Sequence, residues 1–212
     1  MRDRISDWDR RGLVWIYGIR HPLATKFFQI VSHIGSTPFW VVVGLICYVP
    51  SIIFFLFFPA LQDLAHFLLT FCTNLFAAFL VSGFILIPLK YAIYRQRPYM
   101  RYGDIPSRDI YVVDPSFPSG HCAQWVFYGW VASVYLLGNW YLILVAASLP
   151  LIMLSRIYLG SHFPSDTIAG AAIGVGIIFL LMLLIPFFST WIVWFVQNVK
   201  AVVNVLFGEI VP

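Results

Sequence analysis

This sequence contains very little charge. Lysine, arginine, aspartate and glutamate make up 10% of its 212 residues, whereas soluble domains typically contain about 25%. Asp63 is the one charged residue in 27–89, the stretch 115–155 has none, and 157–199 contains Asp166 alone. Each stretch is long enough for a helix across a hydrocarbon core of about 30 Å. The sequence therefore excludes a soluble globule and predicts an integral membrane protein.

Cysteine is also scarce, and the sequence contains no internal repeat or low-complexity tract. Cys47, Cys72 and Cys122 are odd in number and lie in or beside apolar runs. Because a free cysteine behaves as a small apolar side chain, these residues are predicted to be buried thiols. They carry little information about the redox compartment.

The charge that is present lies beside the apolar runs. The net charge is +4, and the basic residues cluster at 2–26 and 90–108. Both clusters flank predicted spans, where basic side chains meet lipid headgroups or a substrate anion. The positive charge is therefore not taken as a sign of nucleic-acid binding.

The first 26 residues do not resemble a secretory signal, because the opening is charged and the apolar run 12–19 is short. On a helix, one face would carry apolar side chains and the opposite face charged ones. The apolar face comprises Ile5, Trp8, Trp15, Ile16 and Ile19, and the charged face comprises Asp3, Asp7 and Arg10. This pattern predicts that 1–26 is an amphipathic segment lying in the membrane interface.

The apolar runs divide into five predicted spans. They cover about 38–59, 62–89, 121–138, 140–157 and 164–185. Pro186 is expected to stop the fifth span, in which Gly170 and Gly174 form a small-residue face for close helix contact. The remaining segment, 187–208, is long enough to cross, although its polar second half also fits an interfacial helix.

The predicted fold class is therefore all-α, a polytopic transmembrane helix bundle of five or six spans with an N-terminal interfacial amphipathic helix. Residues 27–212 are expected to form a single transmembrane domain. Its one long polar stretch is the loop 90–120.

Three polar clusters interrupt the apolar chain. They are Lys90 with Arg97-Pro98, then Pro118-Ser119-Gly120-His121, and finally Ser155-Arg156 with His162 and Asp166. The second span ends at Lys90, the third begins at His121, the fourth ends at Arg156 and the fifth begins near His162. Span counting therefore predicts that all three clusters lie on one side of the membrane, as a single active site requires.

These residue types suit a phosphate group. Two arginines and a lysine can hold tetrahedral oxyanions, and Ser119-Gly120 precede a helix whose free N–H groups attract anions. If a helix begins near Pro164, Asp166 projects back toward His162. A carboxylate that holds one imidazole nitrogen leaves the other free to attack phosphorus. His121 would then protonate the leaving oxygen, and three cations would make a metal unnecessary.

The sequence resembles the type 2 phosphatidic acid phosphatase family. The family pattern is K-x6-R-P, P-S-G-H and S-R-x5-H-x3-D, and this chain has KYAIYRQRP at 90–98, PSGH at 118–121 and SRIYLGSHFPSD at 155–166. The motifs cover 90–166, and the span layout extends the resemblance to 27–186. Many membrane members have another span before the one at 38–59, whereas this chain has an amphipathic segment there.

The resemblance implies a role for each motif residue. The phosphate would be bound by Lys90, Arg97, Ser119, Gly120 and Arg156. His162 would form a phosphohistidine, His121 would be the general acid, and Asp166 would orient His162. The family also implies a metal-independent hydrolase without a cofactor, embedded in the bilayer beside its lipid substrate.

The leading hypothesis is a phosphatase of a bacterial envelope lipid. Lipid A 1-phosphate, phosphatidylglycerophosphate and undecaprenyl pyrophosphate are the substrates that short bacterial relatives suggest. A phosphatase of a soluble ester and an anion transporter are the alternatives. The positive-inside rule would put the site in the cytoplasm, but the catalytic cations should not count toward it. The family implies the outer, periplasmic face of the inner membrane.

Overall fold

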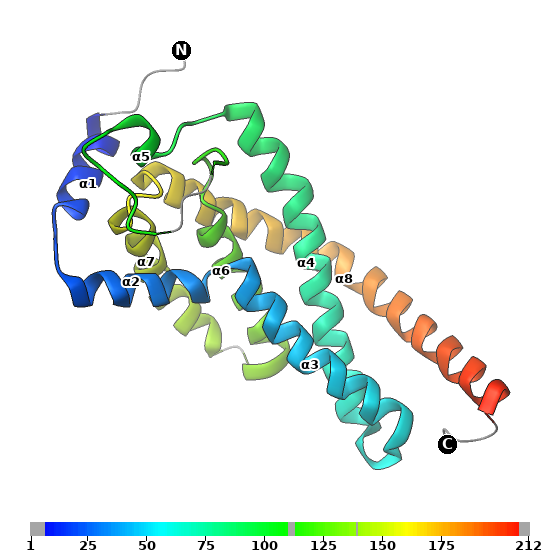
Figure 1. Cartoon of the computed structure of the whole chain (residues 1–212). Coiled ribbons are helices and arrows are strands. Elements are labelled where there is room, and N and C mark those ends of the chain that lie inside the picture. Colours follow the sequence, from blue (N-terminus) through cyan, green and yellow to red (C-terminus); the bar gives the residue numbers. More distant parts are fainter. Residues whose placement is uncertain (1–6, 110–112, 139, 208–212) are drawn as a thin grey trace.

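The structure is a computed structural model that describes residues 7–109, 113–138 and 140–207 (Figure 1). Within these residues the secondary structure is helical, which confirms the predicted all-α fold class. The helices are α1 (Asp7–Tyr17), α2 (Pro22–Ile34), α3 (Thr37–Phe57), η1 (Pro59–Leu61), α4 (Gln62–Ile93), α5 (Pro98–Arg101), α6 (Gly120–Ala132), η2 (Ser133–Leu137), α7 (Tyr141–Tyr158) and α8 (Pro164–Phe207).

Four helical stretches in the described part of the chain are long and apolar enough to cross a membrane. They are Thr37–Phe57, Pro59–Arg101, Tyr141–Tyr158 and Pro164–Val202. They contain α3, α4, α7 and α8, and they confirm the predicted polytopic bundle. The predicted third span is α6, of 13 residues, continued by η2. This segment packs among α3, α4, α7 and α8, and the total of five or six crossings stays a prediction.

The prediction that Pro186 ends a helix is wrong. α8 continues through Pro186 as one helix of 44 residues, because a membrane helix tolerates the loss of the one backbone hydrogen bond that a proline removes. At about 1.5 Å per residue, α8 is roughly 66 Å long, about twice the thickness of a hydrocarbon core. Figure 1 shows α8 crossing α4 obliquely and extending beyond the rest of the bundle.

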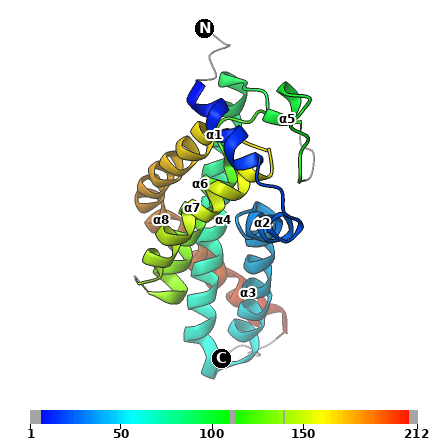
Figure 2. The same cartoon turned by 90° about the vertical axis from the view of Figure 1, so that its left-hand side faces the viewer.

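The N-terminal helix α1 is attached to the bundle. Asp9, Leu13 and Tyr17 are buried, and α1 packs against α7 and the beginning of α8 (Figure 2). Trp8 and Trp15 are exposed on the other side, where an interfacial helix would meet lipid. The predicted face residues Asp3 and Ile5 lie outside the described residues.

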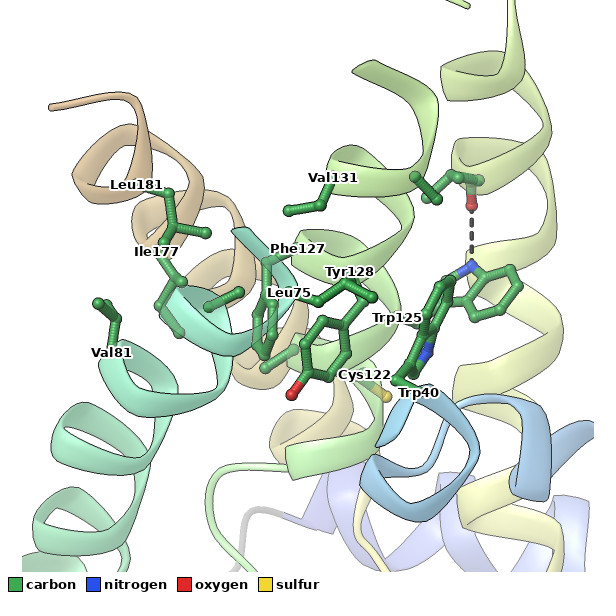
Figure 3. Packing of buried hydrophobic residues seen from close by; sticks show 14 of the residues in the cluster. Trp40, Leu75, Val81, Cys122, Trp125, Phe127, Tyr128, Val131, Ile177 and Leu181 are labelled. Atoms are coloured by element: carbon green, nitrogen blue, oxygen red, sulfur yellow. Dashed lines mark hydrogen bonds between the residues drawn. The ribbon is translucent and has the colours of Figure 1, made fainter. Parts of the chain in front are cut away.

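The apolar core is built around α6. Trp40 of α3 stacks on Tyr128 of α6, with ring centroids 5.4 Å apart, and Trp125 donates a hydrogen bond of 3.2 Å to the carbonyl of Val145 in α7 (Figure 3). On another side of α6, Phe127 points toward α4 and α8 (Figure 3). Since lipid is as apolar as these side chains, close packing is what holds such helices together.

Two glycines of α8 lie close to the backbone at the start of α6. A Cβ added to Gly170 would lie 2.3 Å from the carbonyl oxygen of Ser119, and one added to Gly174 would lie 2.8 Å from that of Ala123. Helix contact through Gly170 and Gly174 is therefore confirmed. It places Ser119-Gly120 directly beside α8.

Gly170→Ala should push α6 away from α8, because its methyl group would overlap the backbone of Ser119. We expect a loss of about 1–3 kcal/mol, the usual cost of overpacking, measured as a lower thermal midpoint in detergent. Gly176→Ala on the same helix is the matched control, since nothing lies within 4 Å of a Cβ there. Equal midpoints for the two variants would contradict the close contact.

Candidate active site

A cavity of about 700 Å³ lies where α4 and α7 end and where α6 and α8 begin. Its polar lining comprises Ser36, Thr37, Ser82, Lys90, Arg97, Asp114, His121, Gln124, Arg156 and His162. Its apolar wall comes chiefly from α4, with Phe79, Leu80, Phe84, Leu86, Ile87 and Pro88, and from Pro38 at the start of α3. The cavity is therefore cationic at one end and apolar along its side.

Two of the cations come from α4 and from the segment that follows it. Lys90 lies in the last turn of α4, which ends before Tyr94, whose φ of 43° is left-handed. Arg97 is the residue directly before α5. Asp114 pairs with both, accepting a bond from Lys90 and a bond of 2.7 Å from Nη2 of Arg97. Nε of Arg97 also donates to the carbonyl of Asp114 at 2.9 Å, so a single residue holds the two cations side by side.

The loop between α7 and α8 carries His162. Its shape comes from Gly160, with a φ of 74°, and from Arg156, whose carbonyl accepts bonds from the amides of Ser161 and His162 at 3.1 and 3.2 Å. The imidazole is 1% exposed, and its Nε2 lies 3.3 Å from Nη1 of Arg97. Nε2 of His162 therefore faces Arg97 within the cavity.

Asp166 lies on the far side of the same imidazole. α8 begins at Pro164, as predicted, and Oδ2 of Asp166 accepts a bond of 2.8 Å from the amide of Phe163. The same oxygen is 3.7 Å from Nδ1 of His162, which has no hydrogen-bond partner among the described residues. The carboxylate is thus aimed at the imidazole at a distance that a small movement would close.

Arg156 is the third cation and is 2% exposed. Its Nη1 donates to the hydroxyl of Ser32 and, at 2.8 Å, to Oδ2 of Asp109. This side chain is therefore fixed by α2 and by the polar loop while it lines the cavity.

The start of α6 completes the site. Gly120 and His121 line the cavity, and Ser119 lies directly behind them. Its amide donates a bond of 2.9 Å to the carbonyl of Asp166, which ties the two helix starts together. All eight predicted site residues, from Lys90 to Asp166, are thus gathered in one place, and their individual roles stay predictions.

Burial and charge set the protonation state of His162. Burial lowers the pKa of His162 well below its ordinary value of 6.5, and the nearby Arg97, Arg156 and Lys90 lower it further. Its imidazole is therefore neutral near pH 7, as a nucleophile must be. Burial opposes ionisation of Asp114, but Lys90 and Arg97 outweigh it and hold the pKa of Asp114 below its usual range.

Sequence reasoning missed several residues of this site. Asp114 and Asp109 neutralise the cations, and Arg95 and Asp9 form an ion pair behind Asp166. A carboxylate four residues before the PSGH motif was a visible signal for Asp114. The local sequence around Asp9 gives no sign that this residue is buried, because it is one of several charged residues at the start of α1.

The chain resembles one known protein family and two solved membrane-protein structures. The family model described as the PAP2 superfamily matches residues 67–190. The chain is similar to the structure of a transmembrane PAP2 type phosphatidylglycerolphosphate phosphatase from Bacillus subtilis, with 23% identity, a TM-score of 0.57 and 82% of each chain covered. It is also similar to LpxE from Aquifex aeolicus, with 22% identity, a TM-score of 0.66 and coverage of 86% of this chain and 99% of the other. No curated protein matches the sequence.

The state of His162 can be observed directly by a pH titration. Because burial and three cations disfavour the imidazolium, we expect the ring to stay neutral until the pH falls well below 6.5. Nuclear magnetic resonance of histidine side chains in detergent micelles would follow the protonation, with His162→Gln to assign the signal. A midpoint at or above 6.5 would contradict the desolvated environment.

Proposed function

Because this chain belongs to the PAP2 superfamily, whose model matches residues 67–190, we propose that it is an integral membrane lipid phosphatase. The observation that supports this most directly is the cavity with cations at one end and an apolar wall along its side. Its cations and His162 can hold and attack a phosphate, while the apolar wall of α4 offers a surface for acyl or prenyl chains. Such a cavity suits a substrate that stays in the bilayer while its headgroup enters the site.

The proposed reaction has two steps. Nε2 of His162 attacks phosphorus, the bond from phosphorus to the lipid oxygen breaks, and His121 gives that oxygen a proton. Water then attacks the phosphohistidine and gives a proton to His121, the N–P bond breaks, and inorganic phosphate leaves with both imidazoles restored. Asp166 would hold the imidazole in position and stabilise its charged form.

The cations would stabilise the charge on the phosphoryl oxygens throughout. Lys90, Arg97 and Arg156 line the cavity from three segments of the chain, and the N–H group of Gly120 adds the positive end of α6. Stabilisation of this kind carries most of the catalysis in phosphoryl transfer. Because three cations supply the positive charge, the proposed mechanism is metal-independent.

For the substrate we propose a phosphorylated bacterial envelope lipid, with lipid A 1-phosphate, phosphatidylglycerophosphate and undecaprenyl pyrophosphate as candidates. The cell inner membrane would be the location, with the active site on its periplasmic face. The protein similar in structure from Bacillus subtilis is itself a phosphatidylglycerolphosphate phosphatase, which supports this class of substrate.

His121→Ala should slow the release of a poor leaving group more than a good one. A lipid alkoxide needs a proton as it departs, and loss of such an acid typically costs about 10²–10⁴-fold, whereas an activated aryl oxide departs without help. Rates of phosphate release from a lipid phosphate and from an aryl phosphate would be compared in the same micelles. Equal losses on both substrates would contradict the acid role.

A substrate panel tests the proposed function itself. The three candidate lipids and a soluble sugar phosphate would be offered in mixed micelles, with released phosphate measured and with His162→Ala as the inactive control. We expect hydrolysis of at least one lipid to exceed that of the soluble ester. A faster soluble substrate would favour a soluble-ester phosphatase, and phosphate flux across vesicles without hydrolysis would favour a transporter.

A further inference from the structure

Arg95 is the residue that joins the catalytic loop to the N-terminal helix. Its Nη1 donates to Oδ1 of Asp166 at 2.5 Å and to the hydroxyl of Ser165 at 2.7 Å, and its Nη2 donates to Oδ2 of Asp9 at 2.6 Å. The guanidinium also lies over the ring of Phe163, 4.2 Å from its centroid. One side chain thus contacts α1, the loop before α8 and the first turn of α8.

Asp9 reaches this network from α1. It is 3% exposed, and its carboxylate accepts bonds from the amide of Ser165 at 2.8 Å and from the hydroxyl of Ser165 at 2.6 Å. The amides in the first turn of a helix have no partner within the helix. Asp9 of α1 accepts a bond from one such amide of α8 and so caps the start of that helix. Gly12 permits this contact, since a Cβ there would lie 3.0 Å from the ring of Pro164.

The two oxygens of Asp166 have different partners. Oδ1 is bound by Arg95, while Oδ2 is bound by the amide of Phe163 and faces Nδ1 of His162. A carboxylate held at one oxygen alone can rotate, but one held at both has a fixed plane. Arg95 therefore contributes to the orientation of Asp166 toward His162.

We propose that Arg95 and Asp9 are positioning residues, which together hold Asp166 in the plane that orients His162. The N-terminal helix α1 is then part of the support of the active site and is more than a membrane attachment. This inference rests on the proposed phosphatase function, because it assigns no chemistry of its own to either residue.

An alternative role for Arg95, attraction of an anionic headgroup, fits the contacts less well. The side chain of Arg95 is 16% exposed, and it donates to two carboxylates. It is also absent from the residues that line the cavity. An arginine committed in this way can orient a neighbour, but it has little capacity left to meet a substrate.

The test uses the full chain in detergent with three variants, Asp9→Asn, Arg95→Lys and Arg95→Gln. Asp7→Asn, at an exposed position on the same helix, is the matched control. We expect kcat per folded molecule to fall about 10–100-fold in the three variants, by analogy with the loss of groups that orient a metal-binding histidine. KM should change much less, and Asp7→Asn should behave as the wild type.

The pH profile separates positioning from a general loss of folded protein. Arg95→Gln removes the charge-assisted bond to Oδ1 of Asp166, so the carboxylate should stabilise the imidazolium of His162 less well and the acidic limb of kcat should move to lower pH. Arg95→Lys keeps the charge but loses the two-pronged geometry, so its rate should fall while the limb moves less than in Arg95→Gln. Misfolding alone would scale the profile and shift neither limb.

The outcomes distinguish this inference from the proposed function. If His162→Ala is inactive while Asp9→Asn and Arg95→Lys keep the wild-type rate, the positioning role is wrong and the phosphatase stands. If the rates fall only in proportion to the folded fraction, the network is structural and the inference is wrong. If His162→Ala keeps full activity, both the proposed nucleophile and the positioning role are overturned.

Discussion

The site depends on keeping like charges together out of water. Lys90, Arg97 and Arg156 line one cavity, where their mutual repulsion is stronger than in water and their desolvation is costly. Carboxylates make this arrangement possible, since Asp114 pairs with Lys90 and Arg97 and Asp109 pairs with Arg156. The fold places the ends of helices and the polar loop so that each cation meets its counter-ion.

The bundle arrangement and the meeting of the three motifs could be predicted because both follow from periodic, local features. Apolar runs define spans, successive spans alternate in direction, and helix ends on one side must meet. The end of α8 could not be predicted from Pro186, because whether a proline stops a helix depends on the neighbours that compensate the lost bond. The structure resolves this in favour of a continuous α8.

The ion pairs behind the motif residues were beyond sequence reasoning for another reason. Arg95 and Asp9 are 86 residues apart, and Asp9 and Ser165 are 156 apart. Which acid meets which base over such separations is decided by how helices pack, and the local pattern around Asp9 gives no sign of it. Arg95 is identified by its contacts with Asp9 of α1 and with Ser165 and Asp166 of α8.

The pairing of Asp114 has a consequence for how a phosphate could enter. All three cations are already paired with a carboxylate, Lys90 and Arg97 with Asp114 and Arg156 with Asp109, so the field that an incoming anion meets at long range is reduced. Binding would be a replacement at short range, in which phosphoryl oxygens take the place of one carboxylate group on the same donors. In this state the carboxylate of Asp114 occupies the donors that a phosphate would use. The selectivity of the cavity would then depend on which anions can displace this carboxylate.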